Sequence, residues 1–446
     1  MEKNAIIIGA GLVGSLWAVY LSRAGYKVRI YEGRSDIRRA DISAGKSINL
    51  ALSNRGWKAL DMVGVGDEIR KIAIPMHGRI MHDMESELTF QPYGKKGQSI
   101  FSISRGGINA KMMDIAEEHG NAQIFYEHQC VDVDLDKGAL TLVNRETGET
   151  VKDSADVVFA CDGAFSVVRY KGMQKLDRFN FSQLYIEDGY REILLPANDD
   201  GSYKLDKNAL HIWPRGRFML IALPNEGGSF TCTLFMPFEN HEHSFNNLKS
   251  KEQVDQFFKS TFPDFYQMMP NIADAWGDHP LSSLAIMRSY PWHHGKIALM
   301  GDAAHATVPF YGQGMNAGFE DCSVMWGLVQ KHNENWPAIF EEYSQIRKAD
   351  GDALQDLSLH NYYVMRDYVA DPQFLLRKKI EAKFSEQYPN DWMPLYSQVT
   401  FSDIPYSEAL KRGKEQDKIM DIVMEMPDIE SKWESEEVMM AIKNQL

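Results

Sequence analysis

The sequence contains few cysteines, and none of them are paired by spacing. Its four cysteines are Cys130, Cys161, Cys232 and Cys322. No Cys-x-x-Cys pair occurs, and widely separated cysteines of this kind are typical of reduced, mostly buried thiols. We therefore expect a cytoplasmic protein without structural disulfides.

Long apolar runs are also missing. No apolar stretch approaches the roughly 20 residues that a membrane helix needs. An apolar strand begins within a few residues of Met1, so we expect no signal peptide. The tail at 429–446 is polar and amphipathic, which favours a form without an apolar C-terminal anchor.

Positive charge is scarce. Lys and Arg number 48 against 62 Asp and Glu, giving a formal net charge of −14. This balance argues against nucleic acid or an anionic membrane as a partner. A hydrophobic content of 44% and a charged content of 25% are ordinary for a globular protein, and 446 residues suffice for about two or three domains.

A glycine-rich loop stands near the N-terminus. The apolar run at 5–8 predicts a buried strand, residues 12–24 have helical spacing, and 27–31 predicts a second strand. In Gly9-x-Gly11-x-x-Gly14, the first glycine permits a tight turn and the second lets backbone approach a pyrophosphate. The third lets the helix pack closely on the strand.

Glu32 ends the second strand, 18 residues after Gly14. A carboxylate at this position can accept hydrogen bonds from an adenosine ribose. The loop, helix and acidic residue together favour a dinucleotide site over a glycine-rich turn without a ligand. The motif alone does not separate NAD from FAD.

Two later segments separate these cofactors. The first, DVVFACDGAFSVVR at 156–169, predicts a buried strand that ends at Asp162, although on its own it also fits a turn plus a surface arginine. The second, IALMGDAAHATVPFYGQGMNAGFED at 297–321, predicts a strand, Asp302 at its tip and a helix that begins near Met315. Asp302 can accept hydrogen bonds from a polyol such as a ribityl chain. The N–H groups around Gly314, Met315 and Asn316 can face the pyrimidine edge of a flavin, where negative charge develops on reduction.

The order of these segments predicts an α/β protein with a discontinuous layout. We expect a Rossmann-like FAD-binding domain at 1–75, 100–180 and 285–350. It would be interleaved with a mostly antiparallel sheet domain that binds the substrate, at 76–99 and 181–284. A helical C-terminal region would follow at 351–446. Helix is expected at 53–72, with Ser53 as its N-cap, and at 108–119; one helix near 251–260 interrupts the second sheet segment.

The three nucleotide segments occur in the order seen in single-component aromatic hydroxylases, and here the chain resembles the class A flavoprotein monooxygenases. A narrower resemblance, to the kynurenine 3-monooxygenase family, covers nearly the whole chain. It rests on the strings KSINLALSNRGWKAL, HGRIMHD, QPYGKKGQSIFSISR, VPFYGQGMNAGFEDC, HNYYVMRD and PLYSQVTFS.

The resemblance implies roles for individual residues. Arg79 and Tyr93 would contact a substrate carboxylate, and Asn361, Tyr396 and Phe235 would complete the pocket. Arg105 would contact FAD, and further cofactor positions are Val13, Glu32, Gly33, Arg34, Ala51 and Cys130. These residue types suit L-kynurenine. Arginine offers a planar fork to its carboxylate, and the side-chain amide of asparagine both donates and accepts hydrogen bonds. Without the resemblance, a solvated arginine and half-buried tyrosines would be the simpler interpretation.

The resemblance also implies an activity. NADPH would reduce the bound FAD, O2 would add to form a flavin C4a-hydroperoxide, and OH transfer would convert L-kynurenine to 3-hydroxy-L-kynurenine. No side chain is expected to act as a catalytic residue beyond the flavin. The alternatives are a hydroxylase of another aromatic acid, a flavin-binding regulatory protein and a plain NAD-binding module.

Two positions depart from the family pattern, and three histidines need an interpretation. Val364 stands where a glutamate is expected, and Tyr311 stands where some relatives carry histidine.

His293, His294 and His305 have no second ligand at metal spacing, so we interpret them as structural and expect no metal site.

Overall fold

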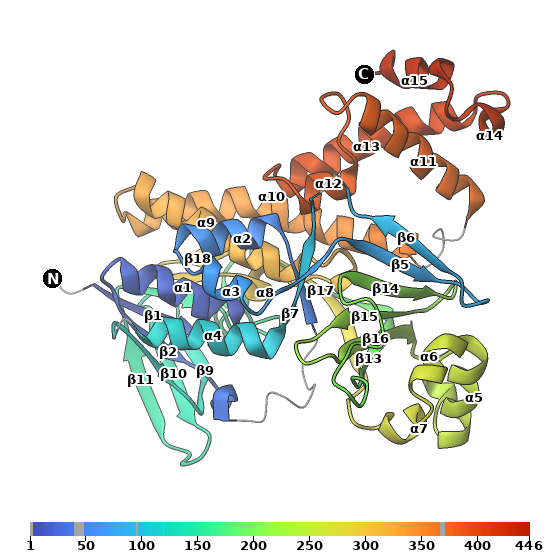
Figure 1. The fold of residues 1–446 in the computed structure, drawn as a ribbon. Helices are drawn as coiled ribbons and strands as arrows, with labels where there is room; N and C mark the ends of the chain where they lie inside the picture. The colour runs from blue at the N-terminus through green and yellow to red at the C-terminus, as the bar shows by residue number, and fades with distance from the viewer. Residues whose placement is uncertain (1–2, 40–48, 95–96, 119, 366–370) are drawn as a thin grey trace.

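The described residues of the computed structural model form two large sheets, two small sheets, the helices that pack on them and a helical C-terminal region (Figure 1). The structure describes residues 3–39, 49–94, 97–118, 120–365 and 371–446. Three of the strings quoted above run partly outside these ranges, at 46–48, 95–96 and 366–367.

The first sheet has six strands, all parallel except the short edge strand β18. Its order is β18 (His293–His294), β19 (Ile297–Leu299), β12 (Val157–Ala160), β1 (Asn4–Ile8), β2 (Lys27–Tyr31) and β8 (Ala122–Phe125). Every residue of β12 and β19 is buried, as expected for central parallel strands. The helices α1 (Leu12–Arg23), α4 (Arg105–Glu118) and α9 (Gly314–Lys331) pack together beside this sheet. The predicted βαβ unit is confirmed.

A small antiparallel sheet extends the same part of the chain. Its order is β11 (Thr150–Ser154), β10 (Ala139–Asn144) and β9 (His128–Asp134), at the lower left of Figure 1. A second small sheet, β3 (Asn49–Leu52), β7 (Ile100–Ser104) and β4 (Ile74–Met76), joins the part with the six-stranded sheet to the larger sheet that follows.

The largest sheet has seven strands and is antiparallel except where β14 pairs with β5. Its order is β17 (Ser282–Tyr290), β13 (Asn180–Leu195), β16 (Phe230–Pro237), β15 (Met219–Pro224), β14 (Ala209–Pro214), β5 (Gly78–His82) and β6 (Leu88–Pro92). One face packs on α5 (Lys251–Thr261), α6 (Pro263–Met268) and α7 (Ile272–Ala275) around a core rich in phenylalanine. The predicted boundary at 284/285 falls inside β17, and the division into domains stays a prediction.

Two expectations for helices need correction. The stretch 53–72 is not one helix: α2 (Asn54–Met62) and α3 (Gly66–Arg70) are separated at Gly64, whose φ is 66°. Ser53 is the N-cap residue of α2 but makes no side-chain capping bond, because its hydroxyl meets the side chain of Gln313 instead. In addition, α6 and α7 follow α5 where only one helix was expected.

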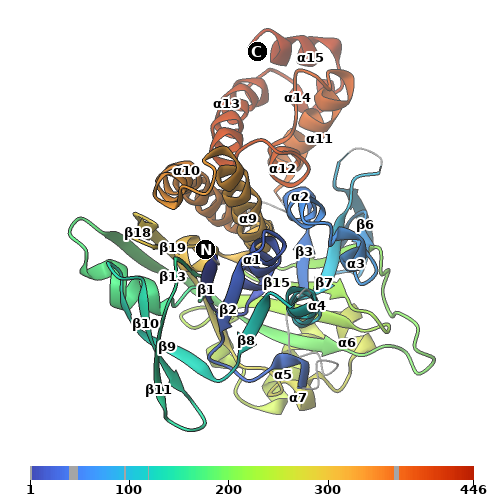
Figure 2. The same cartoon turned by 90° about the vertical axis from the view of Figure 1, so that its left-hand side faces the viewer.

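The remaining chain is helical, as expected. The short α8 (Asp302–His305) and the 3-10 turn Pro309–Tyr311 precede α9, and the long α10 (Trp336–Tyr363) follows it. Figure 2 shows α11, α13, α14 and α15 projecting beyond α9 and α10, away from the two large sheets, while α12 lies beside α2. These helices are α11 (Pro372–Gln387), α12 (Leu395–Thr400), α13 (Tyr406–Met424), α14 (Ile429–Lys432) and α15 (Glu436–Lys443), with a small apolar core of their own. Within the described ranges, no helix is both long and apolar enough to cross a membrane. The predicted fold class is confirmed.

Candidate flavin and substrate site

The three predicted nucleotide segments meet at one edge of the six-stranded sheet. β1, β12 and β19 are adjacent and parallel, with Ile8 opposite Ala160 and Ala160 opposite Leu299. The loops that follow these strands therefore leave the same edge, where open α/β sheets bind ligands. Val13 connects them directly: a Cβ on Gly301 or on Gly318 would lie within 3 Å of its side chain, at 2.8 and 2.6 Å.

The three loop glycines have different surroundings. Gly9 has φ +94°, and a Cβ there would lie 2.5 Å from the carbonyl oxygen of Cys161. A Cβ on Gly14 would lie 2.1 Å from the carbonyl oxygen of Gly9. Gly11 has no heavy atom within 4 Å of its Cβ position and so faces open space. This is the arrangement that the dinucleotide motif requires: two glycines for packing and one for approach of a ligand.

Glu32 directly follows β2, and its side chain reaches the first loop. Its carboxylate accepts hydrogen bonds from the N–H of Ala10 at 2.9 Å and from the backbone and side chain of Arg34 at 3.0 and 2.8 Å. Burial alone would raise the pKa of Glu32, but the bonds and charge of Arg34 hold that pKa below its usual value. Glu32 is therefore a carboxylate beside the first loop, at the place predicted for the ribose.

Asp162 lies at the end of β12 with half of its carboxylate unused. Its Oδ2 accepts from the N–H of Val167 at 2.7 Å and of Val168 at 3.2 Å. Its Oδ1 is buried and has no hydrogen-bond partner in the described part of the chain. Burial raises the pKa of Asp162. An orphaned buried oxygen at a strand tip is what a ligand's donor would satisfy.

Asp302 begins α8 and is exposed, next to Gly301, whose φ is 60°. The Gly301 N–H is held at 2.9 Å by Asp321 of α9, which also pairs with His305 at 2.7 Å. The buried Asp321 thus fixes the turn that presents Asp302. Burial raises the pKa of Asp321, but His305 and Arg347 outweigh this and lower it to about 2.

The first turn of α9 lies against the segment 51–53. Asn316 is fully buried; its side chain accepts from the Ser53 N–H at 2.8 Å and donates to the carbonyl of Ala51 at 2.8 Å. The side chain therefore holds internal structure, and only backbone N–H groups of Gly314, Met315 and Asn316 remain for a ligand. Such groups at a helix N-terminus favour negative charge.

Of the other predicted cofactor residues, Cys130, Gly33 and Ala51 lie near these loops. Cys130, in β9, is near enough to Asp162 for that carboxylate to add to burial in raising the pKa of its thiol to about 12. A Cβ on Gly33 would meet Gln129 of the same strand at 3.4 Å. The Cβ of Ala51 is 3.3 Å from a Cβ built on Gly312. Arg105 is exposed at the start of α4.

Three of the predicted substrate residues form one aromatic and cationic group. The Arg79 guanidinium lies over the rings of Tyr93 and Tyr396, 5.2 and 4.7 Å from their centroids. These two rings stack at 5.6 Å with an angle of 13°. Arg79 Nε and the Tyr93 hydroxyl are buried without a hydrogen bond to any described residue. Arg79 also has no carboxylate within ion-pair distance among the described residues, so an anion is what this group lacks.

The other two predicted substrate residues meet at Phe310. Asn361, near the end of α10, donates to the carbonyl of Phe310 at 2.7 Å. The ring of Phe235 on β16 lies 5.0 Å from the ring of Phe310. The turn Pro309–Tyr311 thus touches both groups, because Tyr311 stacks on Tyr396 at 5.8 Å with an angle of 18°.

Tyr311, which the sequence singled out only as a departure from the family pattern, makes contacts here, as do Gln313 and Arg55, which the sequence did not assign. Tyr311 extends the Tyr93–Tyr396 stack, and Gln313 accepts from the Tyr406 hydroxyl at 3.0 Å. The buried Arg55 joins α2 to the C-terminal helices. An arginine inside an apolar helical pattern was the available signal for Arg55. Val364, the other departure, directly follows α10 and is half-buried.

The three histidines have carboxylate partners. His305 meets Asp321, His293 meets Glu341 at 3.2 Å, and His294 meets Asp136 at 2.8 Å. In the described ranges, no group of three or more His, Cys, Asp or Glu side chains is arranged to hold a metal ion.

The residues present fit FAD. Gly11 leaves open space at the first loop, Asp162 offers an unused buried oxygen, and the α9 N-terminus offers free N–H groups. These features lie along one sheet edge and offer groups for the pyrophosphate, polyol and ring contacts of a flavin dinucleotide.

Comparisons with known proteins agree with this geometry. A family model described as "FAD binding domain" matches residues 2–358. Kynurenine 3-monooxygenase of Flavobacterium psychrophilum is 51% identical over 438 residues, which are 98% of this chain and 97% of that protein. Kynurenine 3-monooxygenase of Sus scrofa is 41% identical over 429 residues, 95% of this chain and 89% of that protein.

Solved structures support the fold alone. A tetrameric form of 2-methyl-3-hydroxypyridine-5-carboxylic acid oxygenase superimposes with a TM-score of 0.67 at 19% identity, covering 83% of this chain and 94% of that chain. Klebsiella pneumoniae HpxO complexed with FAD gives a TM-score of 0.66 at 18% identity, covering 87% of this chain and 97% of that chain.

Fold and site together define the class, that of the FAD-dependent monooxygenases. Within this class, the extent and level of identity to the curated relatives are decisive. The chain belongs to the kynurenine 3-monooxygenase family.

Proposed function

We propose that this protein hydroxylates L-kynurenine at C3, with FAD as the bound cofactor and NADPH as the transient reductant. The balanced reaction consumes L-kynurenine, NADPH, a proton and O2 and yields 3-hydroxy-L-kynurenine, NADP⁺ and water. One observation carries the substrate assignment: the Arg79 guanidinium lies over Tyr93 and Tyr396 with no carboxylate partner among the described residues. The full-length relatives named kynurenine 3-monooxygenase support it.

The cofactor and the substrate would share the chemistry. When bound, FAD supplies the redox capacity that takes electrons from NADPH and activates O2 for transfer of one oxygen atom to the ring. The substrate's own aromatic amino group activates the adjacent ring carbon toward an electrophilic oxygen. The protein therefore need not supply a strong general base.

The side chains would bind, orient and shield. Arg79 and Tyr93 would hold the carboxylate of the substrate, and Phe235 would pack on its ring. Asn361 already donates to the Phe310 carbonyl, which leaves its amide oxygen for the amino-acid end of the substrate. The aromatic residues 310, 311 and 396 would exclude water from the ring edge.

The predicted cofactor residues would hold FAD in the order of the strands. The first loop and Glu32 would bind the adenosine half, and Gly11 would admit the pyrophosphate. Asp162 and Asp302 would accept hydrogen bonds from hydroxyl groups of the central part of the cofactor. The N–H groups at 314–316 would stabilise negative charge on the flavin ring, as a helix N-terminus does.

A cytoplasmic location is part of the proposal. All four cysteines are free and buried. Burial raises the pKa of each thiol well above its usual value, so none is poised for disulfide exchange.

One assay tests the function. The purified protein should be yellow, and L-kynurenine should accelerate NADPH oxidation with formation of 3-hydroxykynurenine. A colourless protein would exclude bound FAD and would leave a plain NAD-binding module as the remaining alternative. A yellow protein whose NADPH oxidation responds to another aromatic acid but not to kynurenine would identify a different hydroxylase. No response to any aromatic acid would favour a regulatory flavoprotein.

A further inference from the structure

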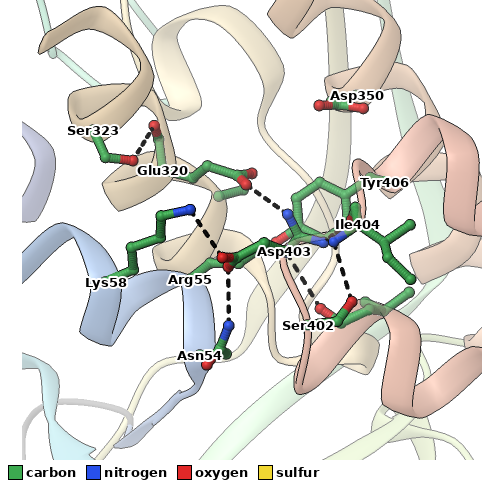
Figure 3. Close-up of polar contacts among 12 residues, drawn as sticks. Asn54, Arg55, Lys58, Glu320, Ser323, Asp350, Ser402, Asp403, Ile404 and Tyr406 are labelled. Atoms are coloured by element: carbon green, nitrogen blue, oxygen red, sulfur yellow. Dashed lines mark hydrogen bonds and ion pairs between the residues drawn. The ribbon is translucent and has the colours of Figure 1, made fainter. Parts of the chain in front are cut away.

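Arg55 is a buried cation at the junction between α2 and the C-terminal helices (Figure 3). Its side chain is only 1% exposed, and Nη1 donates to Glu320 of α9 at 2.5 Å. The other guanidinium donors reach the carbonyl of Val399 at 3.3 Å and the carbonyl of Ile404. One side chain thus joins three separate elements.

Of the two carbonyls that Arg55 binds, one lies at the end of a very short helix and the other lies in the segment that follows this helix. α12 has six residues, and Val399 lies in its last turn, where carbonyls have no partner within the helix. Without Arg55, the Val399 and Ile404 oxygens would lose a charged donor in a buried place. Arg55 therefore fixes the C-terminal end of α12 to the body of the protein.

α12 carries Tyr396, the tyrosine that stacks between Tyr93 and Tyr311 and under the Arg79 guanidinium. This stack, apolar packing against α10 and α13, and the contacts of Arg55 together hold the helix in place. A shift of α12 would move Tyr396 away from Arg79, which is the predicted carboxylate site.

The same arginine faces the predicted flavin side. Its guanidinium lies 4.0 Å from the centroid of the Tyr406 ring, and the Tyr406 hydroxyl donates to Gln313, which directly precedes α9, at 3.0 Å. Two residues before Arg55, the N–H of Ser53 donates to Asn316 in the first turn of α9. Glu320 also pairs with the buried Arg347 of α10 at 2.8 Å. Arg55 therefore stands between the α9 N-terminus and α12.

We propose that Arg55 is a positioning residue for the hydroxylation: it holds α12, and with it Tyr396, in register with the flavin side of the site. This inference rests on the proposed function for its substrate. Arg55 acts through Val399, Ile404 and Tyr406 and need not touch the substrate itself. A lysine at this position would keep the charge near Glu320 but lose the planar fork that serves two carbonyls at once.

The test compares Arg55→Lys with wild type as FAD-loaded, full-length protein. We expect unchanged FAD content and an increase of about tenfold in KM for L-kynurenine, with a smaller change in kcat, because the pocket is displaced rather than the flavin. Amide hydrogen exchange of 395–404 in the substrate-free holoenzyme should be about tenfold faster, because the end of α12 is released. More NADPH should also be oxidised per product formed.

Lys58→Met provides a matched control. Lys58 lies one turn further along α2 and crosses the same junction to Asp403 at 2.9 Å, but both side chains are more than half exposed. Replacing Lys58 should leave the KM for L-kynurenine and the amide hydrogen exchange at 395–404 at their wild-type values. Tyr406→Leu, which removes the ring under the guanidinium, provides a second variant and should shift both readouts in the same direction as Arg55→Lys.

The outcomes separate this inference from the proposed function. If the rate of amide hydrogen exchange at 395–404 is the same as in wild type in both Arg55→Lys and Tyr406→Leu, the claim that Arg55 holds α12 is wrong. Faster exchange with an unchanged KM for L-kynurenine would overturn the link to the substrate. If wild-type protein fails to hydroxylate L-kynurenine, the proposed function is wrong, and the exchange measurement still decides whether Arg55 holds α12.

Discussion

At the scale of single residues, the site is defined by polar groups that the protein leaves incomplete. Arg79 Nε, the Tyr93 hydroxyl and Asp162 Oδ1 are all buried without a hydrogen bond from the described residues. Each such group costs about 1–3 kcal/mol when it stays unsatisfied. Two of them lie where the substrate carboxylate is proposed and one where the cofactor is proposed. We infer that binding offsets these costs.

The role proposed for Arg79 is tested by Arg79→Lys. An ammonium group cannot keep both the ring contacts and a two-point contact with a carboxylate, so KM for L-kynurenine should rise at least about tenfold. FAD content should be unchanged, since Arg79 lies on β5 of the seven-stranded sheet. Steady-state kinetics with NADPH provide the measurement. Arg412→Lys, on the exposed face of α13, is the control; equal KM values for all three proteins would contradict the role.

Residues of the substrate group could be assigned only through the family resemblance. Arg79 and Tyr93 come from one hairpin, on β5 and directly after β6, but Tyr396 comes from α12 much later in the chain, so no local pattern joins all three. Arg55 was missed for a related reason: its partners are the carbonyls of Val399 and Ile404, more than 340 positions away in the chain. Backbone acceptors leave no trace in residue types.

At the scale of elements, the turn between β1 and α1 was predictable in detail, because each of its glycines is required by local sterics or by the approach of a ligand. A Cβ on Gly9 or Gly14 would collide with backbone atoms, whereas Gly11 faces open space. The split of 53–72 into two helices and the presence of α6 and α7 were not predicted. The first had a local signal in Gly64, whose φ is 66°, but the helical spacing on both sides of it suggested one helix; the second shows no clear spacing signal.

The turn offers a matched pair of variants. Gly11→Ala should fold with wild-type stability, because Gly11 has φ −75° and nothing within 4 Å of its Cβ position. It should nevertheless bind FAD at least about tenfold more weakly, since the methyl group would occupy the space proposed for the pyrophosphate. Gly14→Ala should instead destabilise the fold by about 2 kcal/mol or more. Thermal unfolding of the apoprotein and FAD titration check both; equal FAD affinity in Gly11→Ala and wild type would refute the assignment.

α9 is attached to the strand tip through Asp321. Asp321→Asn would remove the charge that pairs with Arg347 at 2.8 Å and with His305, and should destabilise the protein at pH 7 by about 3 kcal/mol. The pKa of Asp321, about 2, is lowered from its unfolded value. Its contribution is therefore fully present above about pH 4 and is lost as the pH falls from there toward the folded pKa.

The difference in stability between wild type and Asp321→Asn should accordingly be constant from neutral pH to about pH 5 and narrow below about pH 4. Urea unfolding across this range provides the measurement. Asp403→Asn, which breaks an exposed pair with Lys58, is the control and should change stability by less than about 1 kcal/mol. A difference that grows as the pH falls would show that another group stabilises the turn.

At the scale of the whole molecule, the site is built from parts that lie far apart in sequence. The proposed cofactor contacts come from the first loop, the end of β12 and the α8–α9 segment, and the proposed substrate contacts come from the seven-stranded sheet, α10 and α12. The interleaved order of the chain predicted this arrangement in outline. The order of the chain did not predict the contacts of Asn316, Arg55 and Tyr406. These contacts connect the elements of the proposed cofactor site to those of the proposed substrate site.

The central claim is that this assembly places an oxygen atom from O2 on the ring of L-kynurenine. Its most direct test is turnover of the FAD-loaded protein with NADPH and L-kynurenine under ¹⁸O2, followed by mass spectrometry of the product. The account predicts 3-hydroxykynurenine that carries one ¹⁸O atom, formed only when NADPH is present. Absence of 3-hydroxykynurenine, or a product whose new oxygen comes from water, would contradict it.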